Sequence, residues 1–154
     1  MFWRAAIAFL ALPGTVAYFA PLAWLLVTNR AILVHPLGLV CLVGGTLGLL
    51  WCVRDFFVQG RGTLAPWAPP ESLVAVGLYR FTRNPMYLSV LSVLIGWALA
   101  FASLHLAAYA VLVGLGFHFR VLYGEEPWLQ EHFGTTWSSY ASQVPRWLGP
   151  RNEA

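Results

Sequence analysis

Charged residues are scarce in this chain of 154 residues, and lysine is missing altogether. Only 10% of the residues are charged, whereas a soluble domain carries about 25%. The chain therefore has too few charges to cover a water-facing surface. Since 59% of its residues are hydrophobic, the composition predicts a single-domain, all-α integral membrane protein.

Other scarcities exclude further classes of protein. The nine basic residues form no arginine-rich run and no basic patch mixed with aromatic residues, so the sequence predicts no nucleic-acid partner. The four histidines and two cysteines show no metal-ligand spacing, so no metal is expected. Cys41 and Cys52 lie eleven residues apart in one apolar segment, roughly 16 Å along a helix. That separation is too long for a disulfide, and both are interpreted as packing residues.

Four apolar stretches have the length of a membrane-spanning helix, which needs about 20 residues. They cover residues 2–27, 32–57, 85–103 and 104–123. Almost nothing separates the last two, so they are expected to form a tight hairpin. In the first stretch, Pro13-Gly14 and Pro21 predict a kink. In the second, Gly44 and Gly48 are four residues apart, a spacing that favours close helix contact.

The arginines indicate how these spans are oriented. With four spans, eight arginines lie on one side of the membrane and only Arg30 lies on the other. The positive-inside rule then places both termini and the loop 59–84 in the cytosol. All six acidic residues lie on the same side, so nearly every charged group is expected at one cytosolic face.

Two clusters at that face stand out, Arg83-Asn84-Pro85-Met86-Tyr87 and Tyr123-Gly124-Glu125-Glu126-Pro127. Helix capping explains part of each cluster. Asn84 and Pro85 suit the start of the third span, Gly124 suits a left-handed end of the fourth, and Pro127 suits the start of a tail helix.

Together, the two clusters predict more than helix ends. Two helix N-termini, two arginines and two glutamates would meet on one face of a compact bundle. Helix N-termini and arginine bind carboxylates, and glutamate accepts hydrogen bonds from a diol or an amino group. S-adenosylmethionine combines a carboxylate, an ammonium, a ribose and a sulfonium, although many amphiphiles also fit this set.

A tail helix is expected over residues 127–144. Its apolar residues are spaced by four, four, three and four positions, which places them on one helix face; they are Leu129, Phe133, Trp137, Tyr140 and Val144. Such an amphipathic helix is typical of the membrane interface or of packing against the bundle.

The segments GLYRFTRNPMYLSV and YGEEPWLQEHFGTTWSSYASQVPRWLGP, within residues 77–150, resemble a family of integral-membrane methyltransferases. This family groups isoprenylcysteine carboxyl methyltransferase with the phospholipid N-methyltransferases. The shared signature is an Arg-[His/Asn]-Pro-x-Tyr run at the start of one span, a Glu-Glu pair after the next, and a tail ending in Val-Pro. The resemblance implies S-adenosylmethionine as cofactor.

The resemblance also assigns roles to particular residues. It implies that Arg83, Asn84 and Tyr87 bind the cofactor beside the loop 59–84, and that Glu125 and Glu126 contact the S-adenosylmethionine moiety. Arg146 matches the arginine of the Val-Pro-Arg tail and is interpreted as a structural anchor. Asn84 stands where the prenylcysteine enzymes commonly have histidine, which leaves the acceptor open.

The reaction expected from this resemblance is an in-line displacement at the methyl carbon. A carboxylate acceptor needs no base, whereas an amine or thiol acceptor must lose a proton. The candidate catalytic residues for that step are Glu125, Glu126 and His118. His118 lies seven residues before Glu125, two helical turns away, so it either lines the same pocket or is an ordinary interfacial histidine.

The function expected from the sequence is methyl transfer to a lipophilic acceptor at the cytosolic membrane face, most like isoprenylcysteine carboxyl O-methylation. The alternatives are N- or S-methylation of a phospholipid or small lipophile, and a non-catalytic four-span scaffold or small transporter. The scaffold would pair its arginines and glutamates with no pocket between them. The bilayer and the acceptor are the expected partners, and the chain is expected to be a monomer or homodimer.

Overall fold

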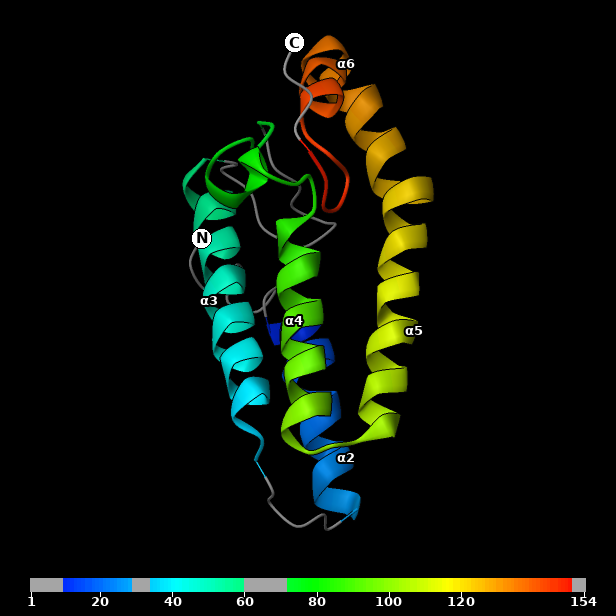
Figure 1. Cartoon of the computed structure of the whole chain (residues 1–154). Helices are drawn as coiled ribbons and strands as arrows, with labels where there is room; N and C mark the ends of the chain where they lie inside the picture. The colour runs from blue at the N-terminus through cyan, green and yellow to red at the C-terminus, as the bar shows by residue number, and fades with distance from the viewer. Residues whose placement is uncertain (1–9, 29–33, 60–71, 151–154) are drawn as a thin grey trace.

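The computed structural model describes residues 10–28, 34–59 and 72–150, and every regular element in these ranges is helical (Figure 1). The all-α fold class is therefore confirmed for the described part of the chain. In chain order the elements are η1 (Leu10–Phe19), α2 (Ala20–Thr28), α3 (Pro36–Val58), η2 (Gly77–Arg80), α4 (Pro85–Ala100), α5 (Leu104–Arg120), η3 (Val121–Glu125) and α6 (Glu126–Gln143).

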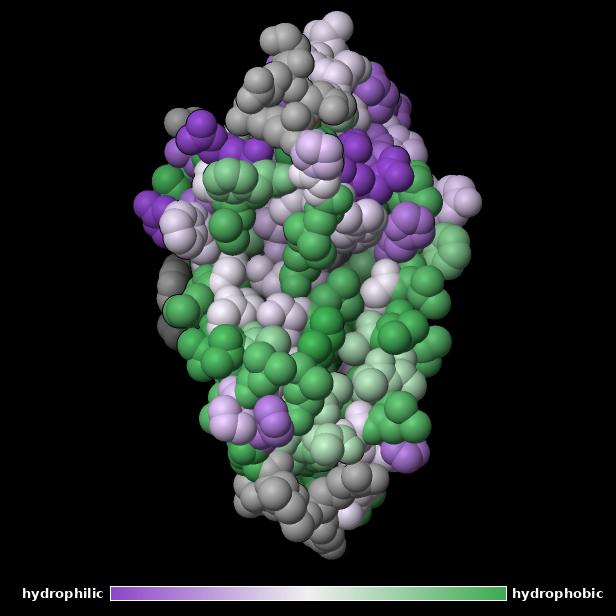
Figure 2. Space-filling model, in the orientation of Figure 1, coloured by the Kyte–Doolittle hydropathy of each residue, from purple (hydrophilic) through white to green (hydrophobic). Residues whose placement is uncertain are grey.

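Hydrophobic side chains cover the middle of the molecule, and hydrophilic ones gather at the end that carries α6 and η2 (Figure 2). Among the described residues, two helices are long and apolar enough to cross a membrane, Pro36–Val58 and the continuous run Leu104–Gln143. The apolar helices Pro13–Thr28 and Pro85–Ala100 are shorter than a usual span. The number of spans predicted from the sequence therefore stays a prediction.

The helices α3 and α4 form the most extensive contact in the bundle and lie side by side in Figure 1. Glycine permits this close approach at one of the two positions expected: a Cβ atom on Gly48 would lie 2.6 Å from the Ser89 hydroxyl oxygen. A Cβ atom on Gly45 would lie 2.7 Å from the Ser89 carbonyl oxygen, and one on Gly96 would lie 2.7 Å from the Leu42 amide nitrogen. Gly44 has no such neighbour within 4 Å, so the expected contact at Gly44 is wrong. The four-residue spacing therefore placed Gly48 correctly at the contact and Gly44 wrongly.

The polar residues of α4 belong to the same helix contact. The Ser92 hydroxyl donates a hydrogen bond to the Cys41 carbonyl at 3.0 Å, and the Ser89 hydroxyl donates to the Pro85 carbonyl at 2.8 Å. These bonds satisfy hydroxyls that would otherwise be buried without partners. The side chains of both serines therefore serve helix packing.

The short link between α4 and α5 makes the tight hairpin that the sequence predicts. Ala102 turns the chain with φ 46°, and the Ser103 hydroxyl caps α5 by accepting a hydrogen bond from the Leu106 amide. Fully buried Val93 and Leu94 then form the core between the helices.

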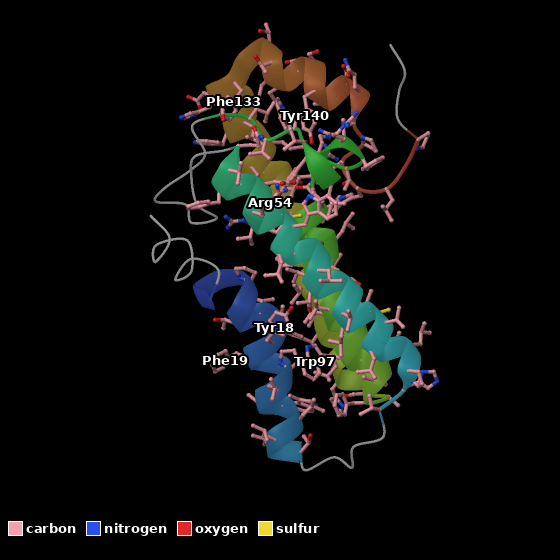
Figure 3. The ribbon with its side chains drawn as sticks, turned by 90° about the vertical axis from the view of Figure 1, so that its left-hand side faces the viewer. Tyr18, Phe19, Arg54, Trp97, Phe133 and Tyr140 are labelled. Carbon is pink, nitrogen blue, oxygen red and sulfur yellow. The ribbon has the colours of Figure 1, made fainter. Side chains whose placement is uncertain are left out.

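The first segment, η1 and α2, packs across the bundle on the side seen in Figure 3, where Tyr18 and Trp97 are labelled. Its residues 10–19 form a π-helix that contains Pro13, and the winding changes to α at Ala20. Pro21 lacks an N–H, so it cannot bond to the Ala17 carbonyl as an α-helical residue would. Trp97 Nε1 donates to that carbonyl instead, at 2.9 Å.

The fourth helix does not end at Gly124, which corrects the prediction of a left-handed terminus there. Gly124 lies within η3, a π-helical turn, and among the described residues the only glycines with positive φ are Gly77 and Gly134. The helical run therefore continues from α5 through η3 into α6. It changes direction at Gly134, where φ is 50° and ψ is −120°, within the expected tail helix.

Candidate active site

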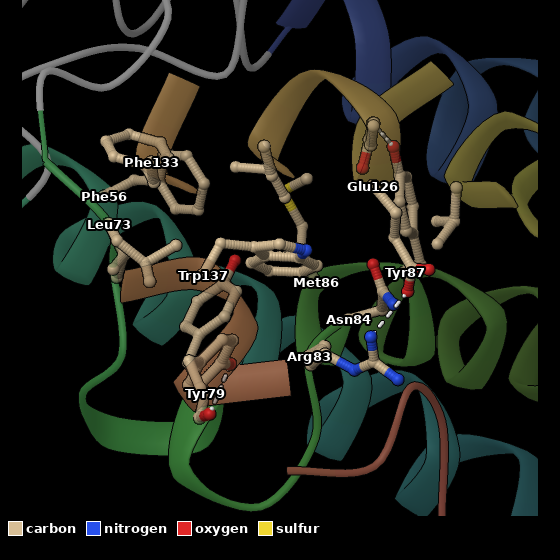
Figure 4. Close-up of a pocket in the computed structure, with 15 residues that line it drawn as sticks. Phe56, Leu73, Tyr79, Arg83, Asn84, Met86, Tyr87, Glu126, Phe133 and Trp137 are labelled. Atoms are coloured by element: carbon tan, nitrogen blue, oxygen red, sulfur yellow. Dashed lines mark hydrogen bonds and ion pairs between the residues drawn. The ribbon is translucent and has the colours of Figure 1, made fainter. Parts of the chain in front are cut away.

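A cavity of about 90 Å³ lies between the start of α4, the π-turn η3 and the helix α6 (Figure 4). Its charged residues gather on one side of the view in Figure 4, and Phe56, Leu73 and Phe133 lie on the other. The described residues that line it are Phe56, Leu73, Val74, Tyr79, Arg83, Asn84, Met86, Tyr87, Val121, Glu125, Glu126, Leu129, Phe133, Trp137 and Tyr140. All five residues expected to bind a cofactor are in this set.

Glu125 joins the two sequence clusters on one side of the cavity. The Tyr87 hydroxyl donates a hydrogen bond to Glu125 Oε1, although the two residues are 38 positions apart. Arg120 Nε donates to the same oxygen at 2.9 Å and to the Tyr87 hydroxyl oxygen at 3.1 Å. The Tyr87 ring stacks on Phe117 with 4.3 Å between centroids, which fixes the direction of its hydroxyl.

Glu126 accepts hydrogen bonds from two arginines. Arg146 approaches it with a bidentate fork, in which Nε donates to Oε1 and Nη2 to Oε2, each at 2.8 Å. Arg83 Nη1 adds a single bond to Oε1 at 2.9 Å. Charge-assisted bonds of this kind are about twice as strong as neutral ones, so Glu126 is held firmly.

The Arg83 side chain is only 15% exposed, and its guanidinium makes one hydrogen bond among the described residues, to Glu126. Its Nε is buried and has no hydrogen-bond partner among the described residues, while its guanidinium lies 5.7 Å from the centroid of the Trp137 ring. Burial lowers the pKa of Arg83, against the opposing effect of the Glu126 carboxylate. This arginine therefore has unused donor capacity beside the cavity.

Asn84 occupies the N-cap position of α4, but its side chain does not cap the helix, contrary to the prediction. Its amide Nδ2 donates instead to the Arg146 carbonyl at 2.9 Å. The Thr82 hydroxyl donates to the same carbonyl at 3.2 Å, and the Arg83 amide donates to the Pro145 carbonyl at 2.9 Å. The carbonyls of Pro145 and Arg146 thus bind the segment before α4 and orient the Asn84 amide by accepting from its Nδ2.

His118 does not line the cavity. Its Nδ1 accepts a hydrogen bond from Trp147 Nε1 at 3.2 Å, and the two rings stack with centroids 6.1 Å apart. The prediction of a shared face assumed an uninterrupted α-helix between His118 and Glu125. The π-turn η3 intervenes and takes up more residues per turn, so the spacing of seven no longer returns to the same face.

Sequence reasoning missed most of the apolar lining and the arginine that bonds to Glu125. The apolar stripe of the tail was a usable signal, since Leu129, Phe133, Trp137 and Tyr140 all line the cavity. Tyr140 also donates its hydroxyl to the Tyr79 carbonyl at 2.7 Å, which ties α6 to η2. Of the loop 59–84, residues 60–71 lie outside the described residues, whereas Leu73, Val74 and Tyr79 contribute to the wall.

The fold and the site together define a class of protein: an apolar helical bundle with an ion-paired cavity at its polar end. The family model described as phospholipid methyltransferase matches residues 33–136. Because this match covers more than half of the chain, the protein belongs to that family, and the family resemblance seen in the sequence is confirmed. No curated protein and no solved structure matched the chain. Membership in this family indicates methyl transfer in a membrane.

Proposed function

We propose that the protein transfers a methyl group from S-adenosylmethionine to a lipophilic acceptor at the membrane surface. One observation carries this proposal: two motifs about forty residues apart meet around a single cavity. Tyr87 bonds to Glu125 and Arg83 bonds to Glu126 across that cavity.

The residues present fit S-adenosylmethionine in their chemistry. The unpartnered Nε of Arg83 is a buried donor suited to a carboxylate. Glu125 and Glu126 offer acceptors for an ammonium or for ribose hydroxyls. The aromatic lining at Trp137 and Tyr140 offers π-faces, which attract a cationic sulfonium.

The cavity must widen to take this ligand, because small-molecule pockets usually enclose about 300–1,000 Å³. A second, more open cavity of about 400 Å³ lies next to it and is lined in part by Leu73 and Tyr140. These two residues line both spaces. We propose that the Tyr140 side chain rotates, which breaks its hydrogen bond to the Tyr79 carbonyl, and so joins the two spaces.

Bound S-adenosylmethionine supplies a methyl group activated by attachment to a cationic sulfur. The contribution of this chain is positioning, since holding two reactants in line lowers a barrier by up to about 7–11 kcal/mol in the best cases. Arg83 and Asn84 would hold the carboxylate of the ligand, and Glu125 and Glu126, which lie beside them, would accept hydrogen bonds from its ammonium or its ribose. If the acceptor is an amine or a thiol, the carboxylate of Glu125 or Glu126 accepts its proton.

The acceptor is proposed to be the carboxylate of a prenylated cysteine, a phospholipid amine or a small lipophilic thiol. Incubation with a labelled methyl donor and one member of each class separates them. Label in the lipid extract supports a phospholipid, and label on the prenylated substrate supports a carboxyl acceptor.

A non-catalytic scaffold is the competing interpretation. It shares with the enzyme the pairing of arginine with glutamate, which is present at Glu125 and Glu126. It differs in requiring no pocket between the pairs, and here both glutamates line a cavity together with Arg83. The cavity therefore favours the enzyme.

The proposal includes the membrane arrangement. Four helical segments cross the bilayer, the amphipathic α6 lies at its interface, and both termini and the cavity face the cytosol. The distribution of arginines supports this orientation. Labelling single introduced cysteines from either side of sealed vesicles tests it.

Titration of the purified protein with S-adenosylmethionine tests the function directly. Calorimetry and thermal denaturation in one detergent are expected to show saturable binding and an increased melting temperature. At least one of Glu125→Gln and Glu126→Gln is expected to weaken binding while the melting temperature without ligand stays close to that of the wild type. Absence of both heat and thermal shift in the wild-type protein would overturn the proposal.

A further inference from the structure

Arg146 and Arg83 bind the same carboxylate in unequal ways, although only Arg83 lines the cavity. Arg146 bonds to both oxygens of Glu126, whereas Arg83 contributes one bond to an oxygen that Arg146 already contacts. Removing the Arg83 bond would leave Glu126 with a complete bidentate partner. Removing Arg146 would leave it with a single bond on a side chain that is only 16% exposed.

The tail holds Arg146 in place independently of its side chain. Its carbonyl accepts bonds from Asn84 and Thr82, and the preceding carbonyl of Pro145 accepts a bond from the Arg83 amide. Buried Val144 anchors one end of this segment. The fork on Glu126 is therefore fixed by a backbone that does not depend on Arg83's side chain.

The net charge of the site also favours the binding of an anion. Three guanidinium groups, those of Arg83, Arg120 and Arg146, contact the two carboxylates of Glu125 and Glu126. One positive charge is thus in excess, and it belongs to the arginine whose Nε is buried without a partner.

We infer that Arg146 is a positioning residue that frees Arg83 for the carboxylate of the ligand. Arg146 keeps Glu126 paired, so Arg83 can turn from Glu126 to an incoming carboxylate without leaving a partly buried glutamate unpaired. This inference rests on the proposed function, because it specifies how that same site accepts the amino-acid end of its ligand. It assigns to Arg146 a role in ligand affinity in place of the structural anchor expected from the sequence.

The decisive variant is Arg146→Gln. In it, Arg83 becomes the only arginine bonded to Glu126, so recruiting Arg83 to the ligand would break the last charged bond of a partly buried carboxylate. Loss of a hydrogen bond to a charged group costs enough free energy of binding to raise the Kd for S-adenosylmethionine about tenfold or more. Arg146→Lys keeps the charge but not the fork, so an intermediate loss is expected. Arg54→Gln is the control for loss of an arginine elsewhere, because Arg54 lies outside the cavity lining and its ion pair is with Asp55, not with either glutamate.

The Kd values of three ligands, compared between Arg146→Gln and the wild type, distinguish this role from a general loss of structure. S-adenosylhomocysteine keeps the carboxylate and lacks the sulfonium, so its Kd should rise as much as that of S-adenosylmethionine. Decarboxylated S-adenosylmethionine lacks the carboxylate that recruits Arg83, so its Kd should be nearly the same in Arg146→Gln and in the wild type. A damaged site would weaken all three ligands alike, and that result would overturn the inference.

A double-mutant cycle with Glu126→Gln provides the second test. In Glu126→Gln, residue 126 is uncharged, so no carboxylate loses its partner when Arg83 turns to the ligand. Adding Arg146→Gln should therefore cause little further loss of affinity. Additive losses would overturn the inference. If Arg146→Gln does not fold, Arg146→Lys tests the same cycle, with a loss in the single variant that disappears in the double variant. Failure of the wild-type protein to bind either carboxylate ligand would instead overturn the proposed function.

Discussion

Alanine at Gly45 would place a methyl group between α3 and α4, against the backbone of the facing helix. The new Cβ would lie 2.7 Å from the Ser89 carbonyl oxygen and 2.8 Å from the Val93 amide nitrogen. Real Cβ atoms do not approach backbone atoms so closely, so the two helices must separate. Overpacking of this kind typically costs about 1–3 kcal/mol of unfolding free energy.

Gly44→Ala is the matched control on the neighbouring position of the same helix. A Cβ atom there meets nothing within 4 Å. Both substitutions gain the same helix propensity, about 0.8–1 kcal/mol in water, so that gain cancels when the variants are compared. Their difference isolates the cost of the helix contact and is expected to be about 1–3 kcal/mol, with Gly45→Ala the less stable.

The assay is unfolding in a single detergent, followed by near-ultraviolet circular dichroism across a denaturant series. Near-ultraviolet signals report tertiary packing, whereas individual helices persist in detergent after the bundle opens. Equal midpoints for Gly44→Ala and Gly45→Ala would refute the helix face assigned to the α3–α4 contact. A less stable Gly44→Ala would show that the contact predicted at Gly44 is the correct one.

Three further predictions concern the site and its support. Tyr87→Phe removes a hydrogen bond to a carboxylate, so the Kd for S-adenosylmethionine should rise about tenfold. Tyr109→Phe is the control, because the Tyr109 hydroxyl donates to a carbonyl in η1, and it should leave this Kd unchanged. Equal effects of the two substitutions would contradict the assignment. Gly77→Ala should lower the melting temperature, because φ is 57° there and the new Cβ would collide with Asp55 Oδ2; an unchanged melting temperature would contradict this. His118→Gln should leave ligand affinity unchanged, since His118 does not line the cavity; a large loss would return it to the candidate catalytic residues.

Local patterns sufficed where the cause of a feature lies within a few residues. The stretch 36–58 is apolar except for Arg54, Asp55 and Thr46, so its helix and its approximate length follow from composition. The hairpin after α4 was predictable because almost no residues separate the two apolar runs, so the helices must pack as neighbours. The motif around Arg83 and the pair Glu125 and Glu126 were recognisable because each is a short contiguous run.

Local patterns failed where a competing partner lies far along the chain. The side chain of Asn84 was expected to cap α4 by accepting from a helix amide, but it makes no such bond, and its Nδ2 donates to the Arg146 carbonyl, 62 residues away. Gly124 was expected to end a helix, but a π-turn carries the helical run past it. That turn also moves His118 out of phase with Glu125.

The sequence by itself determined that the protein is helical and apolar, that its charges gather near one end, and that it carries the motifs of a methyltransferase family. Hydropathy and short motifs are properties of residues that are neighbours in the chain, so they can be identified from the sequence alone. Only the tertiary structure decided that Glu125 bonds to Tyr87 and Arg120, while Glu126 bonds to Arg83 and Arg146. Two adjacent glutamates look alike in sequence, and the direction of each side chain depends on how three helices and the tail pack around them.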